Sequence, residues 1–191
     1  MALYAGKGTC RTCRRKQIGE RMKIGECKNF SDVVYYQSKE NPDRIFIHDV
    51  RSKRNYSFKD FNKIVEKTSN YLISLNVKPK DRITAVIENS PEFCFFYFAT
   101  LRAGAIFNPM PFTSHEEEIK KNVNYVKPKV LLLDSRKKLD IKNEDTKVIQ
   151  VPVSENREFE KSIKSFDDVL EKKVTIDENN TPFASPVVPD E

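Results

Sequence analysis

The 191-residue sequence predicts an α/β fold built on a mostly parallel sheet with helices on both faces. Three observations support this prediction. Segments of strand and helix character alternate along the chain, which is the pattern of strand–helix–strand units. Residues 82–88, RITAVIE, form a mostly apolar run that suits an interior strand covered on both faces. Residues 93–99, FCFFYFA, are apolar all round, as a buried helix would be.

The fold is expected to begin near Phe30. Residues 30–43, FSDVVYYQSKENPD, predict a short helix that ends before its proline, with Ser31 as the candidate N-cap and Phe30 where a hydrophobic staple would pack. Residues 44–50, RIFIHDV, alternate as a strand, and residues 54–56, RNY, are its expected partner.

The clearest helix spans residues 57–76. Apolar side chains recur there at spacings of three and four and form one stripe along the helix. Ser57 and Asp60 have the spacing of a capping box at its start. The apolar strand at residues 82–88 follows.

The next helix is predicted to be buried and to end at Gly104. Asn89 or Ser90 can cap it, and Pro91 suits the first helical turn. Gly104 falls where a helix ends in a left-handed residue, before a strand at residues 105–108. A phosphate-binding loop needs the opposite order, with glycines after a strand and before a helix. Gly104 is therefore interpreted as a structural residue.

Three further elements are predicted before residue 153. Residues 115–126, HEEEIKKNVNYV, form a helix capped by Thr113 or Ser114, with its acidic residues at the amino end as the helix dipole favours. Residues 129–134, KVLLLD, and 147–152, KVIQVP, have the character of strands.

Both ends of the chain are expected to lie outside the α/β subdomain, which is assigned to residues 30–172. Residues 1–28 hold eight basic and two acidic residues, which accounts for the whole net charge of +6, and they are predicted to form a disordered basic arm. A last short helix with its own capping box is predicted at residues 165–172. Residues 173–191 are polar and proline-rich and are predicted to be a linker.

The cysteines do not predict a metal centre. Cys10 and Cys13 have the spacing of half a zinc site, but only Cys27 and the distant His48 could complete four ligands. We therefore expect no metal in this chain. No signal segment opens the sequence, and its apolar runs are far shorter than the roughly 20 residues of a spanning helix, so a soluble cytoplasmic protein is expected.

The middle of the chain resembles the amino-terminal region of the adenylate-forming, or AMP-binding, enzymes. This superfamily contains acyl-CoA synthetases, nonribosomal adenylation domains and luciferases. The resemblance covers residues 30–151 and rests on the order of its motifs: YSF at the start of the long helix, VKPKDRI before a strand, NSPEF leading into the buried helix, and AGA and NP before a loop. Lys80 stands where the family usually has glycine. GAIFNPMPF is similar to the fatty-acid and medium-chain acyl-CoA synthetase branch.

The resemblance implies a ligase that uses ATP, Mg²⁺ and CoA when complete. A carboxylate would attack the α-phosphate of ATP, and the acyl group would then form a thioester with CoA. The family's ATP loop, its later acidic metal residue and the lysine of its mobile lid have no counterpart here. We therefore expect the amino-terminal portion of an acyl-CoA synthetase that is inactive alone. Its expected partners are the missing ATP-binding and lid portions, in cis or in trans, and a carboxylic acid.

Few residues of the chain are candidates for a site. Asn108 and Met110 follow a parallel strand and could border a substrate crevice, because open parallel sheets bind ligands at that edge; a capped strand end is the alternative for both. His48 and His115 are interpreted as surface or loop residues, and Cys94, among aromatic residues, as an inert buried thiol. No catalytic residue is assigned.

A second function from another class stays open. The chain could be a free-standing, non-catalytic interaction protein derived from this subdomain, whose basic arm contacts an acidic partner. Nucleic acid is not the expected partner, because the arm's cations lack interleaved aromatic residues and would attach to phosphates only weakly. Under the synthetase hypothesis, the purified chain alone is expected to catalyse no ATP–pyrophosphate exchange.

Overall fold

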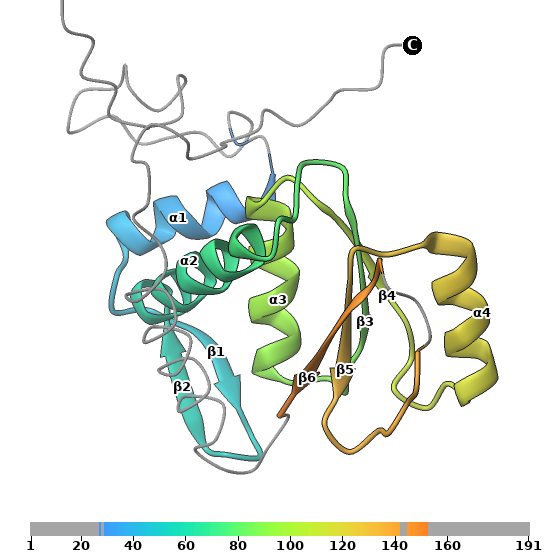
Figure 1. Cartoon of the computed structure of the whole chain (residues 1–191). Helices are drawn as coiled ribbons and strands as arrows, with labels where there is room; N and C mark the ends of the chain where they lie inside the picture. The colour runs from blue at the N-terminus through green and yellow to red at the C-terminus, as the bar shows by residue number, and fades with distance from the viewer. Residues whose placement is uncertain (1–26, 28, 142–144, 153–191) are drawn as a thin grey trace, which may run out of the picture.

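The larger of two sheets is parallel, as predicted (Figure 1). The computed structural model describes residues 27, 29–141 and 145–152, and these contain four helices and six strands. In chain order they are α1 (Phe30–Glu40), β1 (Ile45–Asp49), β2 (Arg54–Ser57), α2 (Phe58–Ser74), β3 (Arg82–Val86), α3 (Pro91–Arg102), β4 (Ile106–Pro109), α4 (Glu116–Val126), β5 (Val130–Asp134) and β6 (Lys147–Val151). The expected helix at residues 165–172, the linker and all of the arm except Cys27 lie outside the described residues.

The parallel sheet has the strand order β4-β3-β5-β6. Strands β3 and β5 lie inside the sheet, and every residue of β5 and all but the first of β3 are buried. The two edge strands, β4 and β6, are partly exposed. The two helices α3 and α4 cover opposite faces of the sheet (Figure 1). The prediction of helices on both faces is therefore confirmed.

Side chains along β3 and β5 alternate between two cores, because successive residues of a strand point to opposite faces. One core lies toward α2 and α3, and α3 is enclosed between the sheet and the pair α1 and α2. This enclosure explains why α3 is apolar all round. The second core is small and lies under α4. The first core includes Phe61, Val65, Leu72, Ile83, Ala85, Phe95, Phe96, Val130 and Leu132, and the second consists of Val86, Ile119, Val123, Leu131 and Leu133.

The hairpin of β1 and β2 is a separate antiparallel sheet that packs on α2. Phe46 of β1 stacks on Phe58 with ring centroids 4.6 Å apart and meets Phe61 edge-on at 4.9 Å. Such aromatic pairs are each worth about 0.5–1.5 kcal/mol beyond their buried area. The hairpin is thereby attached to the main core.

A partly buried arginine joins the three helices on this side. The guanidinium of Arg102, in the last turn of α3, donates to the Oδ1 of Asn62 on α2 at 2.7 Å and to the Oγ of Ser31 on α1 at 3.1 Å. Burial lowers the pKa of Arg102, and its neighbouring acidic groups oppose that effect. The group remains a cation far above neutral pH because arginine is so basic.

Two predicted helix caps are wrong. Helix α1 is capped by Asn29 and not by Ser31: the Asn29 Oδ1 accepts from the N–H groups of Ser31 at 2.8 Å and Asp32 at 3.2 Å. Ser31 is buried, and its hydroxyl is used by Arg102. Helix α4 begins after His115, not after Thr113 or Ser114, because the Glu118 carboxylate accepts from the His115 N–H at 3.0 Å.

The end of α3 at Gly104 is confirmed. Gly104 has φ of 70°, its N–H donates to Leu101 O, and the Ala105 N–H donates to Thr100 O, which together form a Schellman motif. Lys80 also has φ of 70°. This left-handed backbone is the physical reason that glycine suits the position.

Candidate functional site

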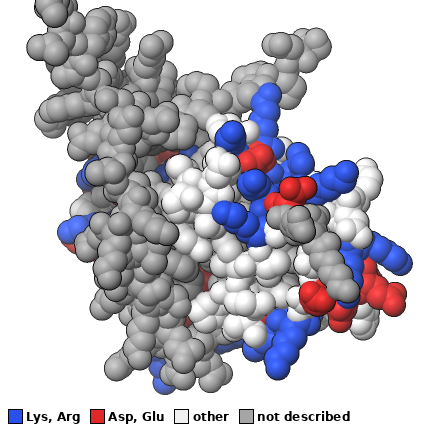
Figure 2. All heavy atoms as spheres, in the orientation of Figure 1, with Lys and Arg blue, Asp and Glu red and all other residues white. Residues whose placement is uncertain are grey.

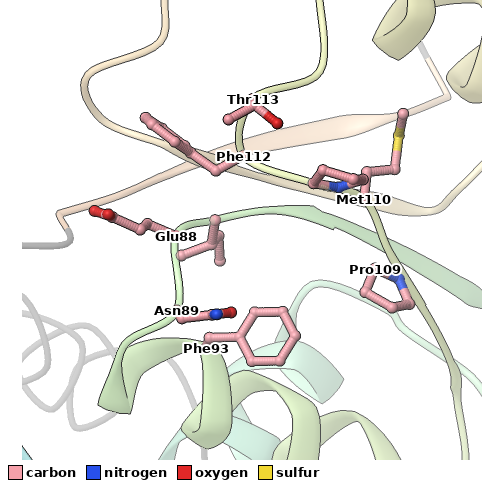
Figure 3. A pocket seen from close by; sticks show the side chains of 9 residues that line it. Glu88, Asn89, Phe93, Pro109, Met110, Phe112 and Thr113 are labelled. Atoms are coloured by element: carbon pink, nitrogen blue, oxygen red, sulfur yellow. The ribbon is translucent and has the colours of Figure 1, made fainter.

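A crevice opens where the carboxyl ends of β3 and β4 meet. Its volume is about 480 Å³, and its walls come from residues 87–89, from Phe93 at the start of α3 and from residues 109–113. Figure 3 shows Phe93 on one side and Phe112 and Thr113 on the other, with Glu88 at one end. Most of the lining is apolar, and the site lies at the edge where open parallel sheets bind ligands.

Proline and helix signals in the sequence shape this crevice. Pro109 ends the edge strand β4, where the missing N–H breaks no ladder bond within the sheet. The Met110 N–H then donates to Ala85 O at 2.8 Å, which keeps the loop against β3. On the other wall, Ser90 caps α3 and so fixes the position of Phe93, whose ring meets Phe107 edge-on at 5.4 Å.

Two arginines share the carboxylate of Glu88 at the rim. Arg51, in the β1–β2 turn, donates through both terminal nitrogens to the two Glu88 oxygens at 2.9 and 2.7 Å. Arg136 donates to Glu88 Oε2 at 2.6 Å. These hydrogen bonds, from Arg51 first and then from Arg136, lower the pKa of Glu88 to about 2. Glu88 is therefore a carboxylate at every physiological pH and a poor general acid or base.

Arg136 also binds Asp134, the last residue of β5. Its Nε donates to Asp134 Oδ1 at 2.9 Å and its Nη2 to Oδ2 at 2.7 Å. Burial alone would raise the pKa of Asp134, but the hydrogen bonds from Arg136 outweigh burial and lower it. The same bonds, to Asp134 first and Glu88 second, raise the pKa of Arg136.

Cationic groups also flank the ring of Phe112. The guanidinium carbon of Arg136 lies 4.5 Å and the Lys137 Nζ 4.9 Å from the ring centroid. Lys137 donates in addition to Ser114 O at 3.1 Å. With Arg51, the rim has three cationic side chains. Glu88 and Asp134 supply two carboxylates, so these five groups carry one net positive charge. An apolar crevice with such a rim suits an organic ligand that ends in an anionic group.

Of the two residues predicted for a crevice, the structure brings one to it. Met110 lines the cavity. Asn108 does not, because its Nδ2 donates to Thr84 Oγ1 and Asn122 Oδ1, each at 3.0 Å, and these bonds hold α4 to the sheet. The sequence-based reasoning missed Glu88 and Arg136. Both follow strands of the parallel sheet, and the same edge rule that selected Met110 could have found them.

The histidines and Cys94 lie elsewhere. His48 is exposed on β1 and hydrogen-bonds Asn55, and His115 is exposed at the start of α4. Cys94 is half-buried, and burial, followed by the charge of Glu92, raises the pKa of its thiol. Within residues 27, 29–141 and 145–152, no three His, Cys, Asp or Glu side chains are grouped to hold a metal ion. Cys10 and Cys13 are outside these residues.

No helix in the part of the chain that the structure describes combines the length and the apolar character that crossing a membrane requires.

The fold is an α/β subdomain with a crevice at the carboxyl edge of its parallel sheet. The chain belongs to the AMP-binding enzyme family, whose sequence model matches residues 34–190. The members of this family to which it is similar include both acyl-CoA ligases and a peptide synthetase. The family is therefore established, and the similarities extend to both of these branches.

Two curated relatives illustrate this range. The hydroxamate-type ferrichrome siderophore peptide synthetase of Schizosaccharomyces pombe is 29% identical over 101 residues, which are 51% of this chain and 2% of that protein. The crotonobetaine/carnitine–CoA ligase of Salmonella typhimurium is 33% identical over 57 residues, which are 30% of this chain and 11% of that protein. The matched regions are thus a small part of each relative.

Solved structures of adenylate-forming enzymes share the fold. ATP-bound MatB from Rhodopseudomonas palustris superposes with a TM-score of 0.61 at 17% identity, over 72% of this chain and 28% of that one. The fatty acyl CoA synthetase of Mycobacterium tuberculosis gives the same TM-score at 16% identity, again over 72% and 28%. The predicted fold, an amino-terminal subdomain of this kind, is confirmed.

Proposed function

We propose that this chain is the amino-terminal portion of an ATP-dependent acyl-CoA synthetase. The complete enzyme would adenylate a carboxylic acid and transfer the acyl group to the thiol of CoA. The observation that carries the proposal is the family match over residues 34–190. The acyl-CoA branch is favoured by the motif GAIFNPMPF at residues 104–112.

The crevice supports this function by its position and its charge. All three substrates of such an enzyme carry anionic groups: the acid its carboxylate, and ATP and CoA their phosphates. The rim cations Arg51, Arg136 and Lys137 would attract such a group, while Phe93 and Met110 offer apolar contacts to the rest of the ligand. We infer that this edge receives part of one substrate.

The same rim does not fit Mg²⁺. The carboxylates of Glu88 and Asp134 already accept hydrogen bonds from arginines, and a cation would have to displace those guanidinium groups. No step that uses the metal is therefore assigned to these residues. In the proposed enzyme, the ATP loop, the acidic metal residue and the lysine lid that the family resemblance implies are supplied by other parts of the protein.

The direct test combines ATP–pyrophosphate exchange with the size of the native polypeptide. An antibody raised against residues 30–151 would capture the protein from its source cell, and exchange would be assayed with carboxylic acids of increasing chain length. The purified 191-residue chain would be assayed in parallel. The expected result is exchange by a captured species well above 22.2 kDa and none by the 191-residue chain. Exchange by that chain, or a captured species of 22.2 kDa, would overturn the proposal.

A further inference from the structure

A second charged surface lies at the amino edge of the parallel sheet, opposite the crevice. We call it the amino-edge patch, and its cations are Lys78, Lys80, Arg82, Lys127, Lys129 and Lys147. In Figure 2 basic side chains gather over the upper part of the sheet, where the strands begin in Figure 1. Five of these six residues are exposed and Lys129 is half-buried.

The strand topology brings these cations together. Arg82 is the first residue of β3 and Lys147 the first of β6, and Lys129 directly precedes β5. The Lys129 N–H donates to Arg82 O at 2.8 Å, and the Lys147 N–H donates to Lys129 O at 3.0 Å. The three residues are therefore neighbours across the sheet. Lys80 and Lys127 join them from the two loops that enter β3 and β5.

Most of this charge is not used inside the fold. Arg82 donates from its Nε to Val126 O at 2.7 Å and so satisfies the end of α4. The five lysine ammonium groups have no ion pair or hydrogen bond to another residue that the structure describes. Two acidic residues, Asp81 and Asp145, lie among them, which leaves a net charge of +4. Residues 29–191 hold equal numbers of basic and acidic residues, so this charge is gathered here and not spread evenly.

Exposed apolar side chains lie beside the cations. Tyr125, in the last turn of α4, is 90% exposed. Ile106 is 52% exposed and pairs with Arg82 in the register of β3 and β4. Lysines attract anionic headgroups, and tyrosine is favoured at the boundary between lipid and water. A single-stranded nucleic acid would bind through bases that stack on aromatic side chains, and an exposed aliphatic side chain such as Ile106 would not contribute to that binding.

We propose that the amino-edge patch docks the protein onto a membrane surface rich in anionic lipid. Its lysines would lie against the headgroups, and Tyr125 and Ile106 would enter the boundary with the acyl chains. The crevice, at the opposite edge of the sheet, then faces water. This interaction is independent of the enzymatic function proposed above.

The first experiment measures sedimentation of the full chain with phosphatidylcholine vesicles that contain 30 mol% or no phosphatidylserine. Binding is expected only with phosphatidylserine. Because a lysine near an anionic surface changes binding roughly fivefold, the triple variant Lys80→Gln, Lys127→Gln and Lys147→Gln should bind about 100-fold more weakly. The matched control replaces Lys59, Lys63 and Lys138, which are also exposed but lie outside the patch, by glutamine. All three proteins keep residues 1–28, so any contribution of the arm is constant.

The second experiment uses the absence of tryptophan from the sequence. Tyr125→Trp introduces a single reporter whose emission should shift to the blue on anionic vesicles and stay unchanged with single-stranded poly(U). The proposal would be overturned if the triple variant and its control lost vesicle binding to the same extent. It would also be overturned if the triple variant bound vesicles less than twofold more weakly than the unchanged chain. Vesicle binding without a blue shift would also overturn it. If the triple variant alone lost binding to RNA, and the tryptophan emission did not shift on vesicles, the patch would be a nucleic-acid site instead.

Discussion

Replacing Lys80 by glycine is expected to stabilise the fold. Lys80 has φ of 70°, and a left-handed backbone costs a residue with a Cβ about 1–2 kcal/mol. Glycine removes this cost but adds about 0.5–1 kcal/mol of conformational freedom to the unfolded chain. The net gain in the free energy of unfolding should be about 0.5–1 kcal/mol. The bond from the residue 80 N–H to Gly104 O at 2.9 Å remains in the variant.

The assay is urea denaturation followed by circular dichroism, with a thermal scan in which Tm should rise by about 2–5 °C. Lys78→Gly is the matched control, because it removes the same charge two residues away, where φ is not positive. That control should lose about 0.5–1 kcal/mol. If both variants shifted stability in the same direction and by a similar amount, backbone strain at Lys80 would not be the cause.

Two further predictions concern the core and the crevice rim. Phe61 is fully buried and contacts the rings of Phe46, Phe95 and Phe98, so Phe61→Ala should lower the free energy of unfolding by about 3–5 kcal/mol in urea titrations; a loss below 1 kcal/mol would contradict this packing. The pKa of Glu88 falls from 4.5 to about 2 on folding, so its ion pairs stabilise the protein above about pH 4.5 and are lost as the pH falls toward 2. Glu88→Gln should therefore weaken the dependence of stability on pH below about pH 4.5. An unchanged dependence would contradict the hydrogen bonds of Arg51 and Arg136 to the Glu88 carboxylate.

The main elements were predictable because their signals are local and repeated. The run from Ile83 to Val86 has no polar interruption except Thr84, and its short length suits a strand covered on both faces. The stripe of α2 and the cap and proline at the start of α3 are signals of the same kind. In each case one segment contains the whole pattern, so no knowledge of its neighbours is needed.

The crevice rim was not predictable in the same way. Arg51 comes from a hairpin turn, Glu88 from the end of β3 and Arg136 from the loop after β5, and nothing periodic links these positions. The cap of α1 was missed for a related reason. Asn29 and Ser31 are both good N-cap residues, and the Ser31 hydroxyl accepts instead from Arg102, which lies 71 residues away in the sequence. Met110 lines the crevice, and its role as a substrate contact stays a prediction.

The partly buried Arg102 has a consequence for how this sequence can change over evolutionary time. Loss of its guanidinium alone would leave the polar groups of Ser31 and Asn62 without their partner, and loss of either partner would leave a desolvated cation less well satisfied. Single substitutions at the three positions should therefore be selected against, whereas a joint replacement by apolar residues of similar volume could be tolerated. Among orthologous sequences, residues 31, 62 and 102 are expected to vary together.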